Sequence, residues 1–364
     1  MRESCICLSS IRQLSNIRFS WAYLKKTTMI KEYNTYQLLQ HNTFGIEAVA
    51  KHFVEFSCEE DILAFLGRGF NGKSLVIGGG SNLLFVGDFD GTVFHSQIMG
   101  IEIAGESDKD VLVRVGSGVN WDSFVAYCVE RGWHGLENLS LIPGEVGASA
   151  VQNVGAYGVE AGDLIEKVEA IAIADASERI FAHGDCCFAY RHSIFKAEEK
   201  GRNIITRVTF RLKKNAAFKL DYGNLRERVE SLGGATLGNV RRAVCEIREA
   251  KLPNPAQMGS AGSFFMNPVV IGEQAAVLLD SYPAMPQYPL PDGRVKLSAG
   301  WMIEQCGWKN NPHANVGVYR HQALVVVNLG KATGKDVLDF ASAVVESVKD
   351  KFGVHLNMEV NVIG

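Results

Sequence analysis

The sequence lacks the strong charge and the long apolar runs that mark several common classes of protein. Its 37 lysine and arginine residues nearly balance 40 aspartate and glutamate residues, which leaves a formal net charge of -3. No overall field therefore draws the chain onto nucleic acid or an anionic membrane surface. No apolar run approaches the roughly 20 residues that cross a bilayer. We expect no nucleic-acid partner and no membrane partner.

Metal and disulfide motifs are missing as well. The nine histidines show no HExxH or HxH spacing, and the eight cysteines show no CxxC pair. Most of the cysteines lie in apolar stretches, where cysteine acts as a small core residue. The sequence therefore predicts no metal site, and it indicates a reducing compartment.

What the chain does have is length. With 364 residues, of which 47% are apolar, it is long enough for two or three domains and a deep cleft between them. The polar segment 213–217 is typical of a linker, so we expect one domain at about 42–213 and another at about 214–364. Residues 1–28 are basic and serine-rich without a signal-peptide core. We expect Met29 to be the true start and residues 1–28 to be a non-native upstream extension without a folded role.

Hydrophobic periodicity predicts an α+β chain, without a regular alternation of strands and helices. Short apolar runs between glycine turns predict strands through the first region, among them SLVIGG, VLVRVGSG and NIITRVTFRL. The helices that we expect are Glu59–Gly67, Trp121–Arg131 with Asn120 as N-cap, a stretch through Arg241–Ala250, and a long amphipathic helix with a capping box at Thr333 and Asp336 that ends before Gly353.

The last residues alternate apolar and polar side chains, as an exposed strand does. The even-numbered residues from Val354 to Val362 are apolar, and the odd-numbered residues between them are polar and include Glu359. The pattern predicts that Glu359 points away from the apolar side.

One motif suggests a nucleoside triphosphatase and has to be weighed. Gly67–Ser74 (GRGFNGKS) matches the phosphate-binding pattern GxxxxGK[ST]. That site needs a strand before the loop and a helix after it, because the loop amides and the helix N-terminus hold the phosphates. Here the expected helix precedes the loop and the strand SLVIGG follows it. The reversed order argues against a triphosphatase.

Two other segments are rich in small residues that leave backbone amides uncovered. GGGSN at Gly78–Asn82 lacks the third glycine of GxGxxG, which argues against a Rossmann dinucleotide-binding motif. The segment could instead form a loop that binds a diphosphate, or a tight hairpin. In Leu139–Glu160, Pro143 suits a first helical position and the small residues of 144–150 keep the surface bare. Together the two segments suggest a large dinucleotide held without a Rossmann fold.

These two segments and several further motifs resemble the family of UDP-N-acetylenolpyruvoylglucosamine reductases over about residues 42–364. The motifs are IGGGSN (77–82), IPGEVGASAVQNVGAYG (142–158), AYRHSIFK (189–196), LDYGNL (220–225), KLPNP (251–255), GSFFMNP (262–268), SAGWMIEQCGWK (298–309) and NMEVNVIG (357–364). The resemblance implies an α+β chain in which a vanillyl-alcohol-oxidase-type (PCMH-type) FAD-binding domain of two subdomains precedes a C-terminal α+β substrate domain. It also implies noncovalent FAD, NADPH as reductant, a UDP-sugar substrate, and a cytoplasmic role in peptidoglycan precursor synthesis.

Carried over motif by motif, the resemblance implies three catalytic residues. Hydride addition to an enol ether that bears a carboxylate builds an enolate, so the site needs charge stabilisation there and a proton donor. Arg191 and Glu359 would stabilise the enolate, and Ser263 would donate the proton. Taken alone, Arg191 would be a surface ion-pair residue, Ser263 a turn residue and Glu359 a solvated side chain. Their joint occurrence inside the family's motifs favours the catalytic interpretation.

The resemblance also implies two sets of binding residues. The cofactor set is Ile77, Gly78, Gly79, Gly80, Ser81, Asn82, Ile142, Pro143, Gly144, Gly147, Ala148, Gln152, Asn153, Gly155, Ala156 and Tyr157. The substrate set is Tyr190, Tyr222, Lys251, Asn267, Tyr288 and Gln322, with Tyr288 in a proline-rich loop similar to the tyrosine lid of the family's longer class. Met266 and Asn361 depart from the pattern, because a basic residue is common at each position.

Two alternatives stay open. Another flavin oxidoreductase of the same fold would have no use for Ser263 and Glu359 together. A non-catalytic nucleotide-sugar sensor would be colourless and would not bind FAD. We expect the protein to be a monomer.

Overall fold

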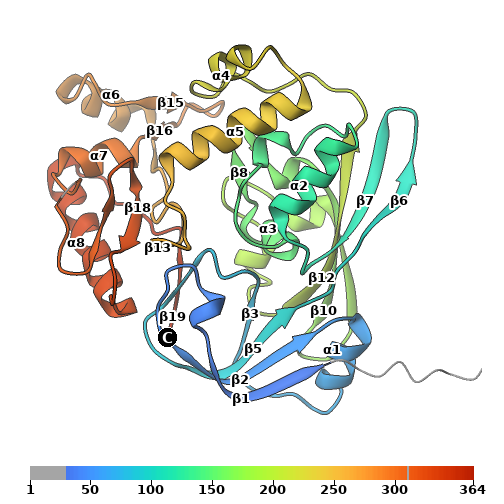
Figure 1. The fold of residues 1–364 in the computed structure, drawn as a ribbon. Coiled ribbons are helices and arrows are strands. Elements are labelled where there is room, and N and C mark those ends of the chain that lie inside the picture. The colour runs from blue at the N-terminus through green and yellow to red at the C-terminus, as the bar shows by residue number, and fades with distance from the viewer. Residues whose placement is uncertain (1–29, 310) are drawn as a thin grey trace, which may run out of the picture.

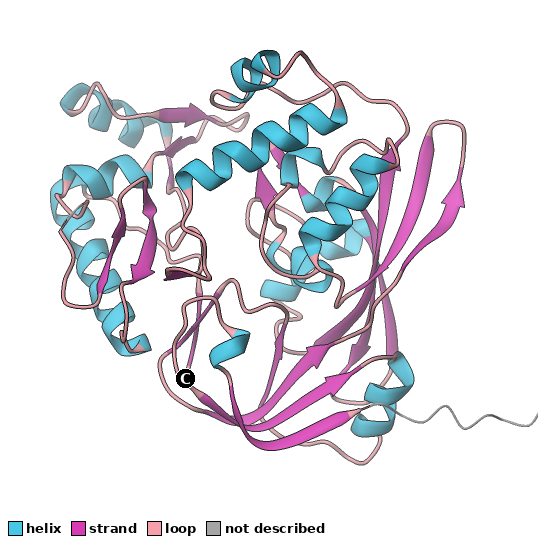
Figure 2. Ribbon diagram, viewed as in Figure 1, coloured by secondary structure: helices cyan, strands magenta, loops and turns pink. Residues whose placement is uncertain are grey.

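The computed structural model describes residues 30–309 and 311–364. The predicted upstream extension lies outside the described residues. Two sheets form the lower and right-hand parts of the view in Figure 1, and the C-terminal residues, orange and red, form the left-hand part. Figure 2 shows that the molecule contains both helices and strands, as expected of an α+β fold.

The first sheet is formed by the N-terminal residues. Its central strand β5 runs parallel to both β2 and β3, and most of its residues are buried, as in a strand covered on both faces. The order in the sheet is β1 (Lys31–Gln37), β2 (Val49–Phe56), β5 (Phe89–Ser96) and β3 (Ser74–Ile77). Helix α1 (Glu59–Leu66) precedes the Gly67–Ser74 loop and β3 follows it, so the reversed order predicted for this motif is confirmed.

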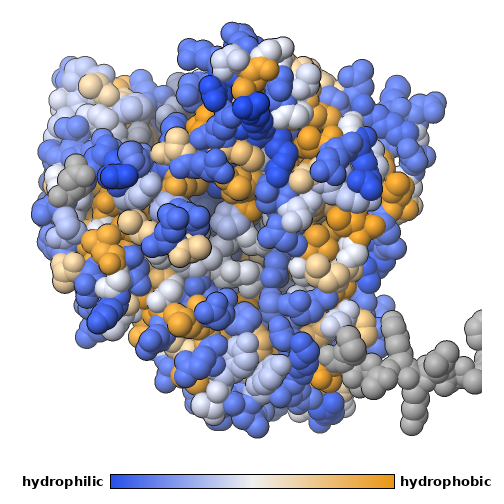
Figure 3. All heavy atoms as spheres, in the orientation of Figure 1, coloured by the Kyte–Doolittle hydropathy of each residue, from blue (hydrophilic) through white to orange (hydrophobic). Residues whose placement is uncertain are grey.

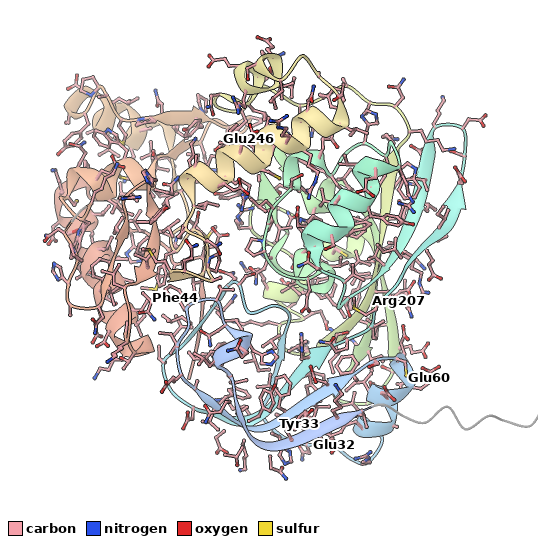
Figure 4. All side chains as sticks on the ribbon, viewed as in Figure 1. Glu32, Tyr33, Phe44, Glu60, Arg207 and Glu246 are labelled. Atoms are coloured by element: carbon pink, nitrogen blue, oxygen red, sulfur yellow. The ribbon has the colours of Figure 1, made fainter. Side chains whose placement is uncertain are left out.

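The second sheet is antiparallel throughout and carries helices α2 and α3 on one face (Figure 1). Its order is β11 (Glu178–Ala182), β10 (Ile165–Ala172), β12 (Asn203–Lys213), β7 (Asp110–Gly116) and β6 (Ile101–Glu106). Arg207 of β12, labelled in Figure 4, forms a 2.8 Å ion pair with Glu59 of α1, the helix that follows β2 of the first sheet.

Helix α2 (Trp121–Glu130) begins as the sequence predicts, because the Asn120 side chain accepts a hydrogen bond from Ser123 N. Helix α3 (Val146–Gln152) follows Glu145, its N-cap residue. Pro143 therefore lies in the preceding loop, and its prediction as the first helical residue is wrong.

The C-terminal residues form small sheets covered by helices. One sheet has the order β13 (Gly259–Ser260), β18 (Gln322–Asn328) and β17 (Val316–Tyr319). Another has the order β14 (Val269–Val270), β16 (Val295–Leu297) and β15 (Gln287–Pro289). The helices are α4 (Leu225–Ser231), α5 (Leu237–Lys251), α6 (Gly272–Ser281), α7 (Ala299–Gln305) and α8 (Gly334–Phe352). The predicted capping box of α8 is present at Thr333 and Asp336, and the helix ends at Gly353 with φ of 65°.

One hydrophobic core joins the two ends of the chain. Phe44 contacts the ring of Phe264 with the centroids 6.0 Å apart, and the Asn328 side chain donates a 3.0 Å hydrogen bond to Phe44 O. Figure 4 labels Phe44 at this junction. Strand β19 (Asn361–Ile363) also pairs with β4 (Leu83–Phe85) in parallel. The expected division at about residue 213 stays a prediction.

The tail differs in part from its predicted alternation. The chain is a strand only over β19, and Val362, predicted on the apolar face, is 40% exposed because it lines a cavity. Val354, Leu356 and Val360 are buried as predicted. The Glu359 side chain is directed into the molecule and only 17% exposed, which the alternation alone does not show.

No helix within residues 30–309 and 311–364 is both long and apolar enough to cross a membrane. Figure 3 shows polar and apolar side chains intermixed over the face in view.

Candidate active site

A cavity of about 830 Å³ lies where three parts of the chain meet. The loop 78–82, the segment 142–157, and residues of the C-terminal part that include Ser263 and Glu359 contribute its walls. The volume falls within the range of about 300 to 1,000 Å³ that holds a cofactor or a substrate. Most of the residues predicted for cofactor and substrate binding therefore share one cavity.

The glycines of the 78–82 loop let two backbones approach closely. A Cβ on Gly79 would lie 3.2 Å from Gly144 Cα, and a Cβ on Gly80 would lie 1.9 Å from His41 O. Gly80 also has φ of 65°, where side chains are strained. β3 and β4 do not pair with each other, so the loop is no hairpin. Bare amides beside an open cavity fit an anionic group such as a diphosphate.

Gly80→Ala is expected to lower the free energy of unfolding by about 2 to 4 kcal/mol, because the new methyl group would collide with His41 O at a positive φ. Chemical denaturation measures the loss. Gly87→Ala is the matched control: a Cβ on Gly87 meets nothing within 4 Å, and it should change the free energy by less than about 1 kcal/mol. Equal losses in the two variants would contradict this account of the loop.

Backbone pairing brings Ser263 and Glu359 together from distant parts of the sequence. Glu359 N donates a 2.8 Å hydrogen bond to Phe264 O, and Met266 N donates a 2.9 Å hydrogen bond to Asn357 O. Ser263 lies at the start of this pairing and lines the cavity. Met266, which departs from the family pattern, lies in the same pairing.

Arg191 reaches Glu359 from a tight turn. Its φ is 53°, and the flanking residues Ala189 and His192 exchange backbone hydrogen bonds. Arg191 Nε lies 2.9 Å from Glu359 Oε1, and Nη2 donates a 2.9 Å hydrogen bond to Gly155 O. A Cβ on Gly155 would lie 2.8 Å from Arg191 Nη1, so a larger residue at this position would displace the guanidinium group.

Burial sets the protonation behaviour of this cluster. Burial raises the pKa of Glu359 above its usual value, although the charges of Arg191 and Lys196 oppose the shift. Burial likewise lowers the pKa of Lys196, which lines the same cavity. Glu359 can therefore hold a proton at a higher pH than an exposed glutamate.

Asn82 holds the tail in place. Its side-chain amide donates to Gln152 Oε1 at 3.1 Å and to Glu359 O at 3.2 Å. The backbone N and side-chain amide of Asn361 both donate to Asn82 O. Asn361 thus links the tail to the glycine loop where the family often has an arginine. The side-chain donors of Asn82 are used within the protein.

Aromatic and cationic side chains also line the cavity. Tyr222, Lys251, Tyr288 and Gln322 all contribute to its wall. Lys296 Nζ lies 5.7 Å from the centroid of the Tyr288 ring. Hydroxyl groups and cations of this kind suit a phosphorylated sugar.

Four predicted binding residues do not line the cavity. Gly144 packs against Gly79 behind the wall. The side chain of Asn153 donates to Glu160 and Ala189 O and accepts from Gly162 N, which is a structural role. Asn267 Oδ1 accepts from Ala299 N at the start of α7, and Tyr190 stacks near Lys296, whose Nζ is 5.0 Å from its ring centroid.

The predicted sets omitted several charged residues of the cavity, namely Glu145, Lys196, Glu199, Lys200 and Arg248. Arg248 is the most informative, because burial lowers its pKa and it has no carboxylate within ion-pair distance in the described part of the chain. Its Nε donates to Leu141 O at 3.2 Å. The signal in the sequence was its place on α5 one turn before Lys251.

Comparison with known proteins identifies the family. Two family models match, an FAD binding domain over residues 50–180 and the C-terminal domain of UDP-N-acetylenolpyruvoylglucosamine reductase over residues 254–363. A UDP-N-acetylenolpyruvoylglucosamine reductase of Bacteroides fragilis is 52% identical over 329 residues, which cover 90% of this chain and 99% of that protein. The chain belongs to the UDP-N-acetylenolpyruvoylglucosamine reductase family.

A further relative and a solved structure agree with this assignment. A reductase of the same name from Porphyromonas gingivalis is 47% identical over 331 residues, which cover 90% of this chain and 98% of that one. The crystal structure of the Thermus caldophilus reductase aligns with a TM-score of 0.64 at 22% identity, covering 93% of this chain and all of that one. The predicted fold class, with a PCMH-type FAD-binding fold, is confirmed. Membership of this family makes the chain an oxidoreductase with FAD as its cofactor.

Proposed function

We propose that the protein uses NADPH to reduce UDP-N-acetylglucosamine enolpyruvate to UDP-N-acetylmuramate, in the cytoplasm, as a step of peptidoglycan precursor synthesis. The observation that carries the proposal is the convergence of Ser263, Arg191 and Glu359 in the same cavity as the glycine loop. These residues supply the proton donor and the charge stabilisation that reduction of an enolpyruvyl ether requires.

FAD, held by the loop 78–82 and the segment 142–157, would supply the hydride-transfer chemistry that links NADPH to the terminal carbon of the enolpyruvyl group. Arg191 and the protonated form of Glu359 would hold the substrate carboxylate and stabilise the negative charge that develops there. Ser263 would donate its proton to the neighbouring carbon. Serine is a weak acid, and it can serve here because an enolate carbon is strongly basic and the hydroxyl is held in place.

The same cavity divides into two binding regions. The backbone amides of the loop 78–82 and the small residues of 142–157 would hold the FAD diphosphate. Lys251 would supply a cation for the UDP diphosphate, with Tyr222 and Tyr288 beside it. Arg248 would add a buried positive charge between the two regions.

FAD is expected to be bound noncovalently, because neither 77–82 nor 142–158 contains the histidine or cysteine that covalent attachment needs. Acid precipitation of the yellow protein should leave the flavin in the supernatant. Flavin that stays with the denatured pellet would contradict this expectation.

A steady-state assay separates the proposal from its rivals. NADPH oxidation should depend on the enolpyruvyl UDP-sugar, whereas a sensor would show no turnover and another flavin oxidoreductase would turn over a different sugar or alcohol. We also propose that the working unit is a monomer, and sedimentation of the FAD-loaded protein tests this.

A further inference from the structure

A buried histidine links two carboxylates beneath the glycine loop. His95 lies at the end of β5 and its side chain is 8% exposed. His95 Nε2 lies 3.0 Å from Glu145 Oε1, and Nδ1 lies 3.3 Å from Glu55 Oε1. Glu55 comes from β2 and Glu145 precedes α3, so three segments meet at one imidazole ring.

Glu145 lies beside Gly78, at the start of the loop 78–82 that we propose binds the FAD diphosphate. It lines the cavity, and a Cβ added to Gly78 would lie 3.2 Å from Glu145 Oε2. A carboxylate in this position would repel an anion held by the amides of Gly78 and its neighbours. A positive charge on His95 would offset that repulsion from behind the loop.

We infer that His95 is a positioning residue of the cofactor site: as the imidazolium ion it holds Glu145 and cancels its charge, and FAD binds tightly only in that state. The inference rests on the proposed placement of the FAD diphosphate. A glycine loop usually binds phosphates through its own backbone amides alone. Here the affinity of the loop for FAD would also depend on the charge of one buried side chain, His95.

The groups around His95 favour its charged form. Burial by itself lowers the pKa of His95, but the hydrogen bonds and charges of Glu145 and Glu55 outweigh burial, so the pKa lies above its ordinary value. Lys31 Nζ lies 3.7 Å from Glu55 Oε2 and offsets part of that charge.

Two further neighbours face the ring. Burial and the charge of His95 lower the pKa of His41, whose ring centroid is 5.2 Å from that of His95. The lowered pKa favours the neutral form of His41 while His95 is charged. The Gln97 side chain lies 3.2 Å from His95 Nδ1 and carries no charge. Glu55 and Glu145 are thus the charged partners in direct contact with His95.

The sign of the pH dependence follows from linkage. A bound anion favours the imidazolium ion, so FAD raises the pKa of His95 further. The dissociation constant of FAD should be low and constant below the pKa of His95 in the free protein. It should rise by up to about tenfold per pH unit between that pKa and the pKa in the FAD complex, and then level off.

The first test uses the unaltered protein stripped of FAD. FAD affinity is measured by quenching of flavin fluorescence from pH 5.5 to 9.5, and proton uptake on binding by calorimetry in buffers of different ionisation enthalpy. We expect a total rise of roughly 10- to 100-fold in the dissociation constant and a net uptake of protons in the middle of the range. FAD binding without pH dependence and without proton uptake would overturn the inference and leave the proposed function intact. No FAD binding at any pH would overturn both.

Variants test the pairing itself. His95→Gln should weaken FAD binding at neutral pH about tenfold or more, because no imidazolium ion then offsets the carboxylate of Glu145. The pH dependence that belongs to His95 should be lost in this variant. Glu145→Gln should bind FAD at least as tightly as the unaltered protein, with a much smaller pH dependence.

The double variant His95→Gln/Glu145→Gln should regain most of the affinity lost in His95→Gln, a rescue that mere damage to packing would not give. Thermal unfolding of each variant without FAD shows whether it is folded. A His95→Gln protein with unaltered affinity and pH profile would overturn the inference, and so would a Glu145→Gln protein that lost FAD, since the carboxylate would then be a direct ligand.

Discussion

Ser263→Ala is expected to slow the oxidation of the reduced enzyme by the enolpyruvyl UDP-sugar by roughly 10² to 10⁴-fold, the range for a positioned acid. Reduction of the flavin by NADPH should proceed at nearly the unaltered rate, because no proton is delivered to the sugar in that half-reaction. Stopped-flow absorbance of the flavin follows both steps. Substrate affinity should change little, since one small hydroxyl contributes little to binding compared with Lys251 and Tyr222.

Ser342→Ala is a suitable control for this variant. Ser342 is exposed on α8 and its hydroxyl donates to Leu338 O within the same helix. Both half-reactions should keep their rates in this variant. If Ser263→Ala instead slowed flavin reduction and left reoxidation by the sugar unchanged, the role proposed for Ser263 would be wrong.

Glu359→Gln is expected to slow the same oxidative half-reaction by roughly 10² to 10³-fold, because it weakens the stabilisation of the developing enolate. The structure adds an expectation about pH. Burial raises the pKa of Glu359, so the protonated form, which can donate a hydrogen bond to the substrate carboxylate, is complete below that pKa and is lost as the pH rises through it. The rate of the unaltered enzyme should therefore fall on the alkaline side.

The pH profile of the variant distinguishes charge from shape. Glu359→Gln keeps the size of the side chain but cannot titrate, so its low rate should lose the alkaline fall that belongs to this group. Glu346→Gln, on the exposed face of α8, is the matched control and should keep both the rate and the profile. A Glu359→Gln enzyme with the full rate and an unchanged profile would exclude Glu359 from the chemistry.

The features predicted correctly from the sequence are those decided within a few residues. The Asn120 cap, the capping box at Thr333 and the order of helix, loop and strand around Gly67–Ser74 all depend on neighbours in the chain. Side-chain direction at the tail was less predictable. Val362 is exposed to the cavity, and Glu359 is buried among charges, because residues from distant segments surround them.

The site shows the same division. Ser263, Arg191 and Glu359 were predicted from the family's motifs. The proximity of Ser263 and Glu359, however, depends on backbone pairing between 264–266 and 357–359, which no local sequence pattern predicts. Asn267 carries a motif position, and yet its side-chain oxygen accepts a hydrogen bond from Ala299 N at the start of α7. His95 and Glu145 become neighbours only when β5 and the segment before α3 are folded together.

The central claim is that FAD and an enolpyruvyl UDP-sugar bind in the same cavity, and that the sugar is reduced there by the reduced flavin. The most direct test is anaerobic: the FAD-loaded protein is reduced with one equivalent of NADPH, and the flavin absorbance is recorded before and after addition of UDP-N-acetylglucosamine enolpyruvate. We predict that the flavin stays reduced until the sugar is added and is then reoxidised, with one UDP-N-acetylmuramate formed per flavin. A flavin that stays reduced in the presence of saturating sugar would contradict the account.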